Sequence, residues 1–229
     1  ITHVLSTIPP TAEGHDPVLT HLGSQLKERS LTWVGYLSTT GVYGDQQGRW
    51  VSEDDPANPG QPRSQRRHAC EQAWLDSGLP VQILRLPGIY GPGRSVLESL
   101  RAGKARRILK ADQVFCRIHV DDIAGACLHL MHQAAAGPGP AIVNVSDDRP
   151  AAPQDLLQYG AALLNCKLPD EEPFELASHS MSAMARSFWS ENRRVRNTLL
   201  CQQLGYALLH SDFKAGLQDC LRQESQSCS

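Results

Sequence analysis

The chain has no long apolar stretch and no excess of charge of one sign. Every apolar run falls short of the roughly 20 residues that a membrane-spanning helix needs, so no membrane role is expected. Its 22 Lys and Arg residues are matched by 24 Asp and Glu residues, which gives a net charge of −2. A nucleic-acid partner bound through charge is therefore not expected either.

The chain also lacks a paired cysteine motif and a recognisable secretory signal. Its 7 cysteines are scattered, and no two form a Cys-x-x-Cys pair. Such a pattern argues against a disulfide frame or a zinc site and favours free thiols in a reducing compartment. Residues 1–10 have neither the basic start nor the length of a signal peptide. We expect a cytoplasmic protein, or one inside an organelle if a targeting segment precedes Ile1.

The opening residues follow a strand–helix–strand order without a glycine-rich turn. Residues 1–8 and 31–37 have the apolar character of buried strands, and a helix is expected to begin at Pro17. This order builds a parallel sheet. Gly14 and Gly23 are isolated, so no turn here brings several backbone N–H groups to a pyrophosphate.

The most distinctive stretch follows the second of these strands. Residues 38–45 read Ser-Thr-Thr-Gly-Val-Tyr-Gly-Asp, so an apolar run ends in three hydroxyl residues and a glycine. At the carboxyl end of a parallel strand, such hydroxyls can bind a substrate oxygen, or they can cap their own backbone in a turn. The segment resembles the Ser/Thr-x-x-Val-Tyr-Gly motif of the extended short-chain dehydrogenase/reductases, the NAD-dependent epimerase/dehydratase family.

The resemblance implies roles for the residues of this motif. Thr39 lies four positions before the tyrosine, where the family places its catalytic Ser or Thr, and would hold the substrate oxygen. Ser38, Thr40 and Tyr43 would lie on the substrate side. The expected partner is then a small molecule, a nucleotide sugar or a related alcohol or carbonyl compound, and a homodimer stays open.

A helix is expected over residues 62–77, where the family carries Tyr-x-x-x-Lys. Aligning Glu71 with the family's glutamate on this helix puts Arg63 at the tyrosine and Arg67 at the lysine. A guanidinium stays protonated, so Arg63 cannot accept a proton, whereas Arg67 can still donate to a ribose or phosphate. The alternative is a solvated helix face. A catalytic protein would need an atypical base, such as His68 or Glu71.

Residues 79–94 are the most specific match to the family. A strand over 81–86 breaks at a Pro-Gly pair, and a second turn follows at 91–93. The string resembles the family's sixth strand and its Leu-Arg-x-x-x-Ile-Tyr-Gly-Pro-Gly loop, which a strand with two proline turns does not explain. By this resemblance the nicotinamide would be bordered by Leu86, Pro87 and Gly88, and the substrate by Tyr90 and Arg94.

Two further segments carry charge. Residues 104–110 are basic, and form either a solvated face or an anion site. Residues 115–122 resemble the family's Arg-Ile-His-Val-Asp-Asp segment, with Arg117 on the substrate side and Asp121 or Asp122 expected to cap a helix over 123–133. No metal is expected, because His129 and His132 have no third ligand in register.

The rest of the chain predicts a smaller, mostly helical part. We expect a strand over residues 141–146, a helix over 153–166, a loop over 167–177, helices through 181–221 and a polar tail over 222–229. Residues 190–206 resemble the closing segment of one subgroup of the family. The predicted fold is therefore α/β, with an N-terminally incomplete, Rossmann-like parallel sheet in residues 1–150 and a helical substrate cap in residues 151–229.

Two functions stay open. The chain is an NAD- or NADP-binding, epimerase/dehydratase-like enzyme with an atypical site, or an inactive relative that serves as a binding or regulatory protein. The cofactor's nicotinamide side would meet Ser6, Thr7 and Pro9 besides Arg67 and residues 86–88. Because the phosphate-binding turn is missing, we expect the carboxyl-terminal part of a longer protein, and weak cofactor binding by this chain alone.

Overall fold

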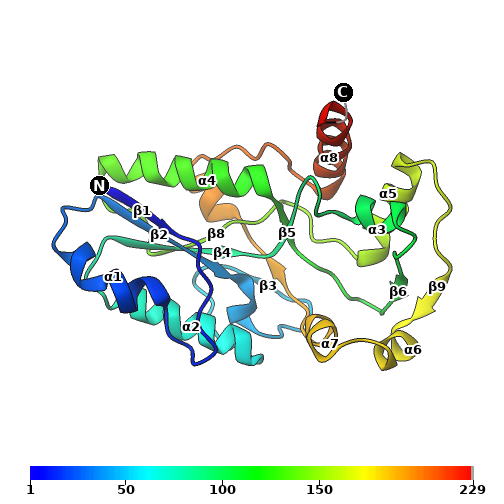
Figure 1. Cartoon of the computed structure of the whole chain (residues 1–229), viewed down its shortest axis with the longest axis horizontal. Helices are drawn as coiled ribbons and strands as arrows, with labels where there is room; N and C mark the ends of the chain where they lie inside the picture. Colours follow the sequence, from blue (N-terminus) through cyan, green and yellow to red (C-terminus); the bar gives the residue numbers. More distant parts are fainter. Residues whose placement is uncertain (228–229) are drawn as a thin grey trace.

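The computed structural model describes residues 1–227 and is built around a four-stranded parallel sheet (Figure 1). The strand order is β1-β2-β4-β8. The strands are β1 (His3–Ser6), β2 (Trp33–Thr39), β4 (Val81–Leu86) and β8 (Ile142–Asn144). The α/β prediction with a parallel sheet is confirmed.

Three helices cover the two faces of this sheet, which explains why its strands are apolar on both sides. The helices are α1 (Pro17–Lys27), α2 (Pro62–Leu75) and α4 (Val120–Gln133). Val34 and Tyr36 of β2 pack with Trp74 on the face covered by α1 and α2. Trp33 and Leu84 pack with α4 on the other face. No helix in residues 1–227 combines the length and the apolar character needed to cross a bilayer.

The start of α1 follows from local sequence. Asp16 precedes Pro17, and its Oδ1 accepts a hydrogen bond of 2.9 Å from the Leu19 N–H, as an N-cap does. The other oxygen, Oδ2, accepts from the indole N–H of Trp74 at 3.0 Å. One capping carboxylate therefore starts α1 and ties it to α2.

Most of the remaining helices, with two short strands, form a second body, here called the cap, to the right of the sheet in Figure 1. Its core joins α3, α5 and α8 through residues such as Leu97, Leu156 and Leu217. The cap comprises α3 (Val96–Arg101), β6 (Arg107–Leu109), α5 (Pro153–Leu163), β9 (Glu171–Pro173), α6 (Phe174–His179), α7 (Ala183–Trp189) and α8 (Phe213–Ser227).

Short parallel strand pairs join the sheet, the cap and the loops between them. In the cap, β6 pairs with β9; between the bodies, β5 (Gly88–Tyr90) pairs with β7 (Arg117–His119), and β3 (Trp50–Val51) with β10 (Arg194–Val195). Short helical turns lie at Thr40–Tyr43, Ala134–Ala136 and Leu199–Gln203.

Three predictions about the carboxyl-terminal half are wrong. Residues 167–177, expected to be a loop, contain β9 and most of α6, because β9 finds a partner in β6. Residues 190–212, expected to be helical, are mostly irregular apart from β10 and the turn Leu199–Gln203, and Asn192 O accepts from the N–H groups of Gln46 and Gly48. The polar tail expected over residues 222–229 is helical through residue 227 as part of α8, in which Leu217 packs inside; residues 228–229 lie outside the described residues.

The predicted cap of α4 is also wrong. The helix begins at Val120, and the ring Nδ1 of His119 accepts a 3.2 Å hydrogen bond from the Asp121 N–H. The carboxylates of Asp121 and Asp122 lie in the first turn, where their charge still suits the helix dipole. The histidine takes the capping role because it is the side chain that immediately precedes the helix.

Candidate functional site

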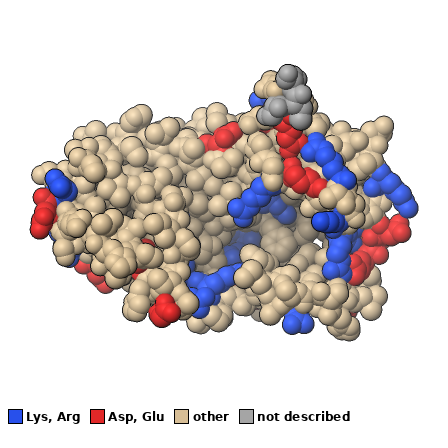
Figure 2. All heavy atoms as spheres, viewed as in Figure 1, with Lys and Arg blue, Asp and Glu red and all other residues tan. Residues whose placement is uncertain are grey.

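A cavity of about 670 Å³ lies between the carboxyl edge of the sheet and the cap. This volume falls within the usual range for small-molecule sites. In Figure 2 a hollow lies to the right of the centre, with Lys and Arg side chains gathered around it. The lining residues are Thr39, Thr40, Gly41, Arg63, Ser64, Arg67, Pro87, Gly88, Arg94, residues 114–117, Phe188, Trp189, Glu191 and Arg193.

Five of the described lining residues are arginines, and one is a carboxylate. Three of the arginines are held by carbonyl groups. Arg67 donates to Leu37 O at 3.1 Å, Arg117 to Phe115 O at 2.9 Å, and Arg193 to Gly44 O at 2.8 Å. Burial lowers the pKa of Arg117 to about 10, against the attraction of the nearby carboxylates, so it remains charged at neutral pH. The cavity is therefore strongly positive.

The carboxylate, Glu191, is largely committed to this framework. Its Oε2 accepts from Arg193 Nη1 at 2.7 Å, and its Oε1 is buried without a hydrogen-bond partner among the described residues. Gln113 holds the backbone of the same residue through a 3.0 Å bond to Glu191 O. The Glu191 side chain offsets part of the positive charge, but the cavity keeps an excess of positive charge.

Arg63 behaves differently from the other inner arginines. Its guanidinium stacks on the ring of Phe188, with Cζ 3.8 Å from the ring centroid. Burial lowers the pKa of Arg63, while the attraction of Glu191 acts in the opposite direction. Phe188, Trp189 and Phe115 supply an aromatic wall beside the arginines. Charge and flat apolar surface therefore meet in one cavity.

Thr39 ends β2 at the edge of the cavity, and the structure confirms the capping interpretation of its hydroxyl segment, while the substrate role remains a prediction. Its Oγ1 accepts a 3.1 Å hydrogen bond from the Gly41 N–H, which caps the turn Thr40–Tyr43. The hydroxyl proton is left to donate to a ligand. A Cβ at Gly41 would lie 2.6 Å from Ser64 Oγ, so the glycine lets α2 approach the strand end closely.

The two proposed substitutes for the missing base lie away from the cavity. Glu71 is fully buried and accepts from Arg85 Nε at 3.1 Å, from Arg85 Nη2 at 2.8 Å and from Ser38 Oγ at 2.5 Å. His68 Nδ1 lies 3.4 Å from the same carboxylate. Neither residue, nor Ser38, is among the described residues that line the cavity.

Three more predicted residues are buried in the framework around the cavity. The Tyr43 hydroxyl donates to Asn144 Oδ1 at 2.8 Å, and the Tyr90 hydroxyl to Asp212 O at 3.4 Å. Burial raises the pKa of both tyrosines, which disfavours their ionisation. Leu86 packs in the core beneath Pro87 and Gly88. The roles that the family resemblance gives these residues remain predictions.

The residues predicted to meet the nicotinamide on β1 lie on the same edge of the sheet. Ser6 is buried at the carboxyl end of β1, and its Oγ has no hydrogen-bond partner among the described residues. Thr7 and Pro9 follow it and are exposed. None of the three belongs to the cavity lining, and their roles also remain predictions.

Sequence reasoning missed the wall that the cap contributes. It did not single out Phe115, Phe188, Trp189, Glu191 or Arg193, all of which line the cavity. The available signal was the family resemblance of residues 115–122 and 190–206, which contain Phe115, Glu191 and Arg193 but did not assign a role to these side chains; nothing in the sequence analysis pointed to Phe188 or Trp189.

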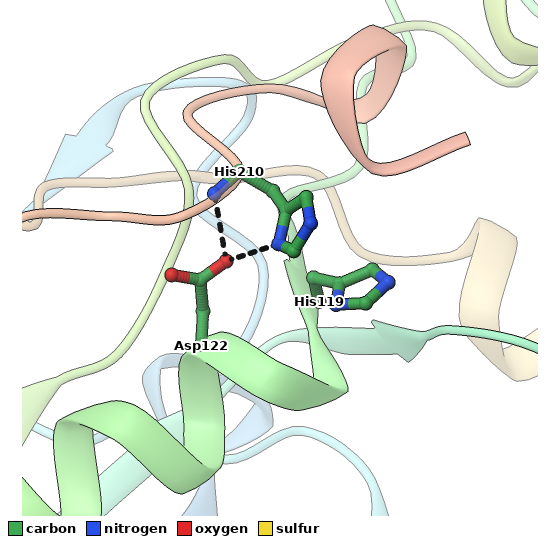
Figure 3. A group of neighbouring side chains, drawn as sticks. All are labelled: His119, Asp122 and His210. Atoms are coloured by element: carbon green, nitrogen blue, oxygen red, sulfur yellow. Dashed lines mark hydrogen bonds and ion pairs between the residues drawn. The ribbon is translucent and has the colours of Figure 1, made fainter. Parts of the chain in front are cut away.

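A second group of titratable side chains, His119, Asp122 and His210, lies outside the cavity (Figure 3). Asp122 accepts from the backbone N–H groups of Leu209 and His210 at 2.7 and 3.0 Å, and His210 Nδ1 lies 2.9 Å from its Oδ2. The rings of His119 and His210 lie 4.0 Å apart. These groups are close enough for a metal, but their donors are already used to fasten α4 to the segment before α8.

The comparisons with known proteins agree with this architecture. The family model described as "NAD dependent epimerase/dehydratase family" matches residues 18–146. Protein YeeZ of Escherichia coli K12 is 36% identical over 104 residues, which cover 44% of this chain and 36% of that protein. The match thus spans just over a third of the length of the curated relative.

Solved structures extend the likeness over the whole chain. A functionally unknown conserved protein from Silicibacter pomeroyi is 43% identical, with a TM-score of 0.88 over 99% of this chain and 78% of that chain. A dTDP-glucose 4,6-dehydratase from Bacillus anthracis, solved in complex with NAD, shares the fold at 16% identity and a TM-score of 0.76, over 99% of this chain and 73% of its own. The chain belongs to the NAD-dependent epimerase/dehydratase family.

Proposed function

We propose that the protein binds NAD or NADP along the carboxyl edge of its sheet and an anionic, nucleotide-linked sugar, or a related alcohol or carbonyl compound, in the arginine-lined cavity. The observation that carries the proposal is the position and charge of this cavity. It lies where ligands bind in open parallel sheets, and five arginines face one carboxylate in its lining among the described residues. Arginine binds the oxygens of a pyrophosphate through charge-assisted, bidentate hydrogen bonds.

The residues present fit the nicotinamide end of such a cofactor. Ser6 offers a buried hydroxyl without a partner among the described residues, Gly88 lines the cavity, and Arg67 keeps N–H groups that its contacts with Tyr36 Oη and Leu37 O do not use. The nicotinamide, when bound, would accept or return a hydride. Thr39 would hold the oxygen of the reacting carbon through its free hydroxyl proton.

A second candidate function is binding or regulation without turnover. It is favoured by one specific observation: no tyrosine or lysine occurs in the described cavity lining, and Arg63 stands where the family's proton carrier is expected. The lining thiol, Cys116, is an unsuitable base because burial raises its pKa to about 11. Glu191 is held by Arg193.

Absorbance of the reduced nicotinamide distinguishes the two candidates. The purified protein is mixed with NAD⁺ or NADP⁺, or with the reduced forms, and with a panel of nucleotide sugars. A substrate-dependent change in nicotinamide absorbance supports an enzyme. Calorimetric binding of a nucleotide sugar without any absorbance change supports the binding function, and absence of both binding and turnover contradicts the proposal.

A further inference from the structure

Arg63 is a charged group in the cavity that makes no ion pair with residues 1–227. Within residues 1–227, no carboxylate or carbonyl oxygen lies within hydrogen-bond distance of its guanidinium, which instead stacks on Phe188 at 3.8 Å. Stacking uses the flat face of a guanidinium. Its N–H donors lie in its plane and stay available at the edge.

Arg67 and Arg117, which line the same cavity, differ in this respect. Arg67 donates to Tyr36 Oη and to Leu37 O, and Arg117 donates to Phe115 O and Ala151 O. These bonds fix part of each guanidinium to the protein framework. Arg63 makes no such bond with any described residue, so its full set of donors is open to a ligand.

The environment of Arg63 favours an incoming anion. Partial burial lowers its pKa, because a cation removed from water without a partner is unfavourable. Phe188 compensates only in part through its ring. Glu191 attracts Arg63, but this carboxylate is already hydrogen bonded to Arg193 at 2.7 Å. A ligand carboxylate would complete the missing ion pair.

The position of Arg63 makes this a contact with the reacting end of a ligand. It lies in the first turn of α2, next to Ser64, which approaches Gly41 at the end of β2. Thr39, two residues before that glycine, lines the same cavity. An anion at Arg63 would therefore lie near the hydroxyl that is expected to hold the substrate oxygen.

We propose that Arg63 binds a carboxylate of the ligand, so that the cavity accepts an acidic sugar in preference to a neutral one. This inference rests on the proposed function. A carboxylate is planar, and its two oxygens match the two parallel N–H groups of a guanidinium. A phosphate dianion suits the place less well, because the buried Glu191 carboxylate nearby would repel its second charge.

The test compares two ligands that differ by one carboxylate, UDP-glucuronate and UDP-glucose. Titration calorimetry of the purified protein should give at least about tenfold tighter binding of UDP-glucuronate. Arg63→Gln should abolish this preference, because it should weaken the binding of UDP-glucuronate more than the binding of UDP-glucose. Arg63→Lys should keep part of the preference, because it retains the charge but loses the bidentate geometry.

Arg186→Gln is the matched control, since Arg186 is exposed on α7 and lies outside the cavity lining. It should keep the full preference. Equal affinities for the two ligands, or a preference that survives in Arg63→Gln, overturn the inference and leave the proposed function intact.

Titration of free glucuronate and free glucose in the same way distinguishes a failure of the Arg63 carboxylate site from a failure of the proposed function. If free glucuronate binds through Arg63 and neither nucleotide sugar binds, the result supports a carboxylate site at Arg63 and contradicts the proposed nucleotide-linked ligand. If none of the four compounds binds, both are overturned. Thermal melting of each variant confirms that lost binding reflects the site and not the fold.

Discussion

Replacing Glu71 by glutamine should lower the free energy of unfolding by about 3–5 kcal/mol. The carboxylate is buried between α2 and β4, with side-chain exposures of 0% for Glu71 and 3% for Arg85. Glutamine keeps the shape but loses the charge. It leaves the guanidinium of Arg85 in the protein interior without a counterion.

The magnitude follows from the contacts that are lost. Two charge-assisted hydrogen bonds join the pair, at 3.1 Å through Arg85 Nε and 2.8 Å through Nη2. Each such bond contributes about 1.5–3 kcal/mol. The ring of Tyr43, 4.7 Å from Arg85 Cζ, recovers a fraction of the loss through its attraction for the cation. Solvent screening is small because both groups are buried.

Urea denaturation followed by circular dichroism measures the change. Arg85→Met alone should lower the free energy of unfolding by a similar amount, since it leaves the Glu71 carboxylate unpaired. The double variant Glu71→Leu with Arg85→Met should be more stable than either single variant, because it removes both charges together. Asp170→Asn is the control, because its ion pair with Lys167 is exposed and should contribute nothing measurable.

If the free energy of unfolding of Glu71→Gln lies within about 1 kcal/mol of the wild-type value, Glu71 and Arg85 do not form a stabilising ion pair. Breaking a buried ion pair lowers this free energy several times more. If such a protein also lost turnover, Glu71 would return as a candidate base. If Glu71→Gln is less stable but its folded fraction still binds the ligand, Glu71 has a structural role and not a catalytic one.

Three further predictions concern the cavity and the histidine cluster. Thr39→Val should reduce turnover, where turnover occurs, because it removes the hydroxyl at the substrate oxygen; unchanged activity would rule out this role for Thr39. Arg63→Tyr with Arg67→Lys should raise hydride transfer by about 10²–10⁴-fold, measured by nicotinamide absorbance, and robust turnover of the unaltered protein would contradict the reasoning. Burial and the nearby His210 lower the pKa of His119 from 6.5, so the folded state resists its protonation and the His119 contribution to stability is lost as the pH falls below about 6.5. The stability difference between the wild type and His119→Asn, measured by urea denaturation, should narrow between pH 7 and pH 5; a constant difference would refute this coupling.

The amino-acid sequence by itself determined the elements whose signals are local. Most of the strand predicted over residues 31–37 lies in β2, which runs over Trp33–Thr39, and its apolar residues serve both faces, as a central parallel strand requires. The Asp-Pro pair at residues 16 and 17 begins α1. The strand over residues 81–86 has the predicted bounds because a Pro-Gly pair ends it. Capping, proline geometry and side-chain periodicity act within a few residues, so they can be recognised without a tertiary structure.

Tertiary contacts decided the elements that need a distant partner. β9 and β10 are short strands that exist because β6 and β3 pair with them. Their own sequences, rich in charged residues, do not favour a strand. His119 caps α4 in place of the two aspartates, and Asp122 is free to bind the segment at Leu209 and His210.

The cavity is likewise a product of the tertiary structure. The motif at the end of β2 predicted that Thr39 would lie at a binding edge, but nothing local brings Phe188 and Arg193 to Arg63. Nor does local sequence reveal that Glu71 is neutralised by Arg85 of the neighbouring strand. Charge pairing and cavity shape depend on which surfaces meet when the cap packs on the sheet, and residues more than a hundred positions apart become neighbours only then.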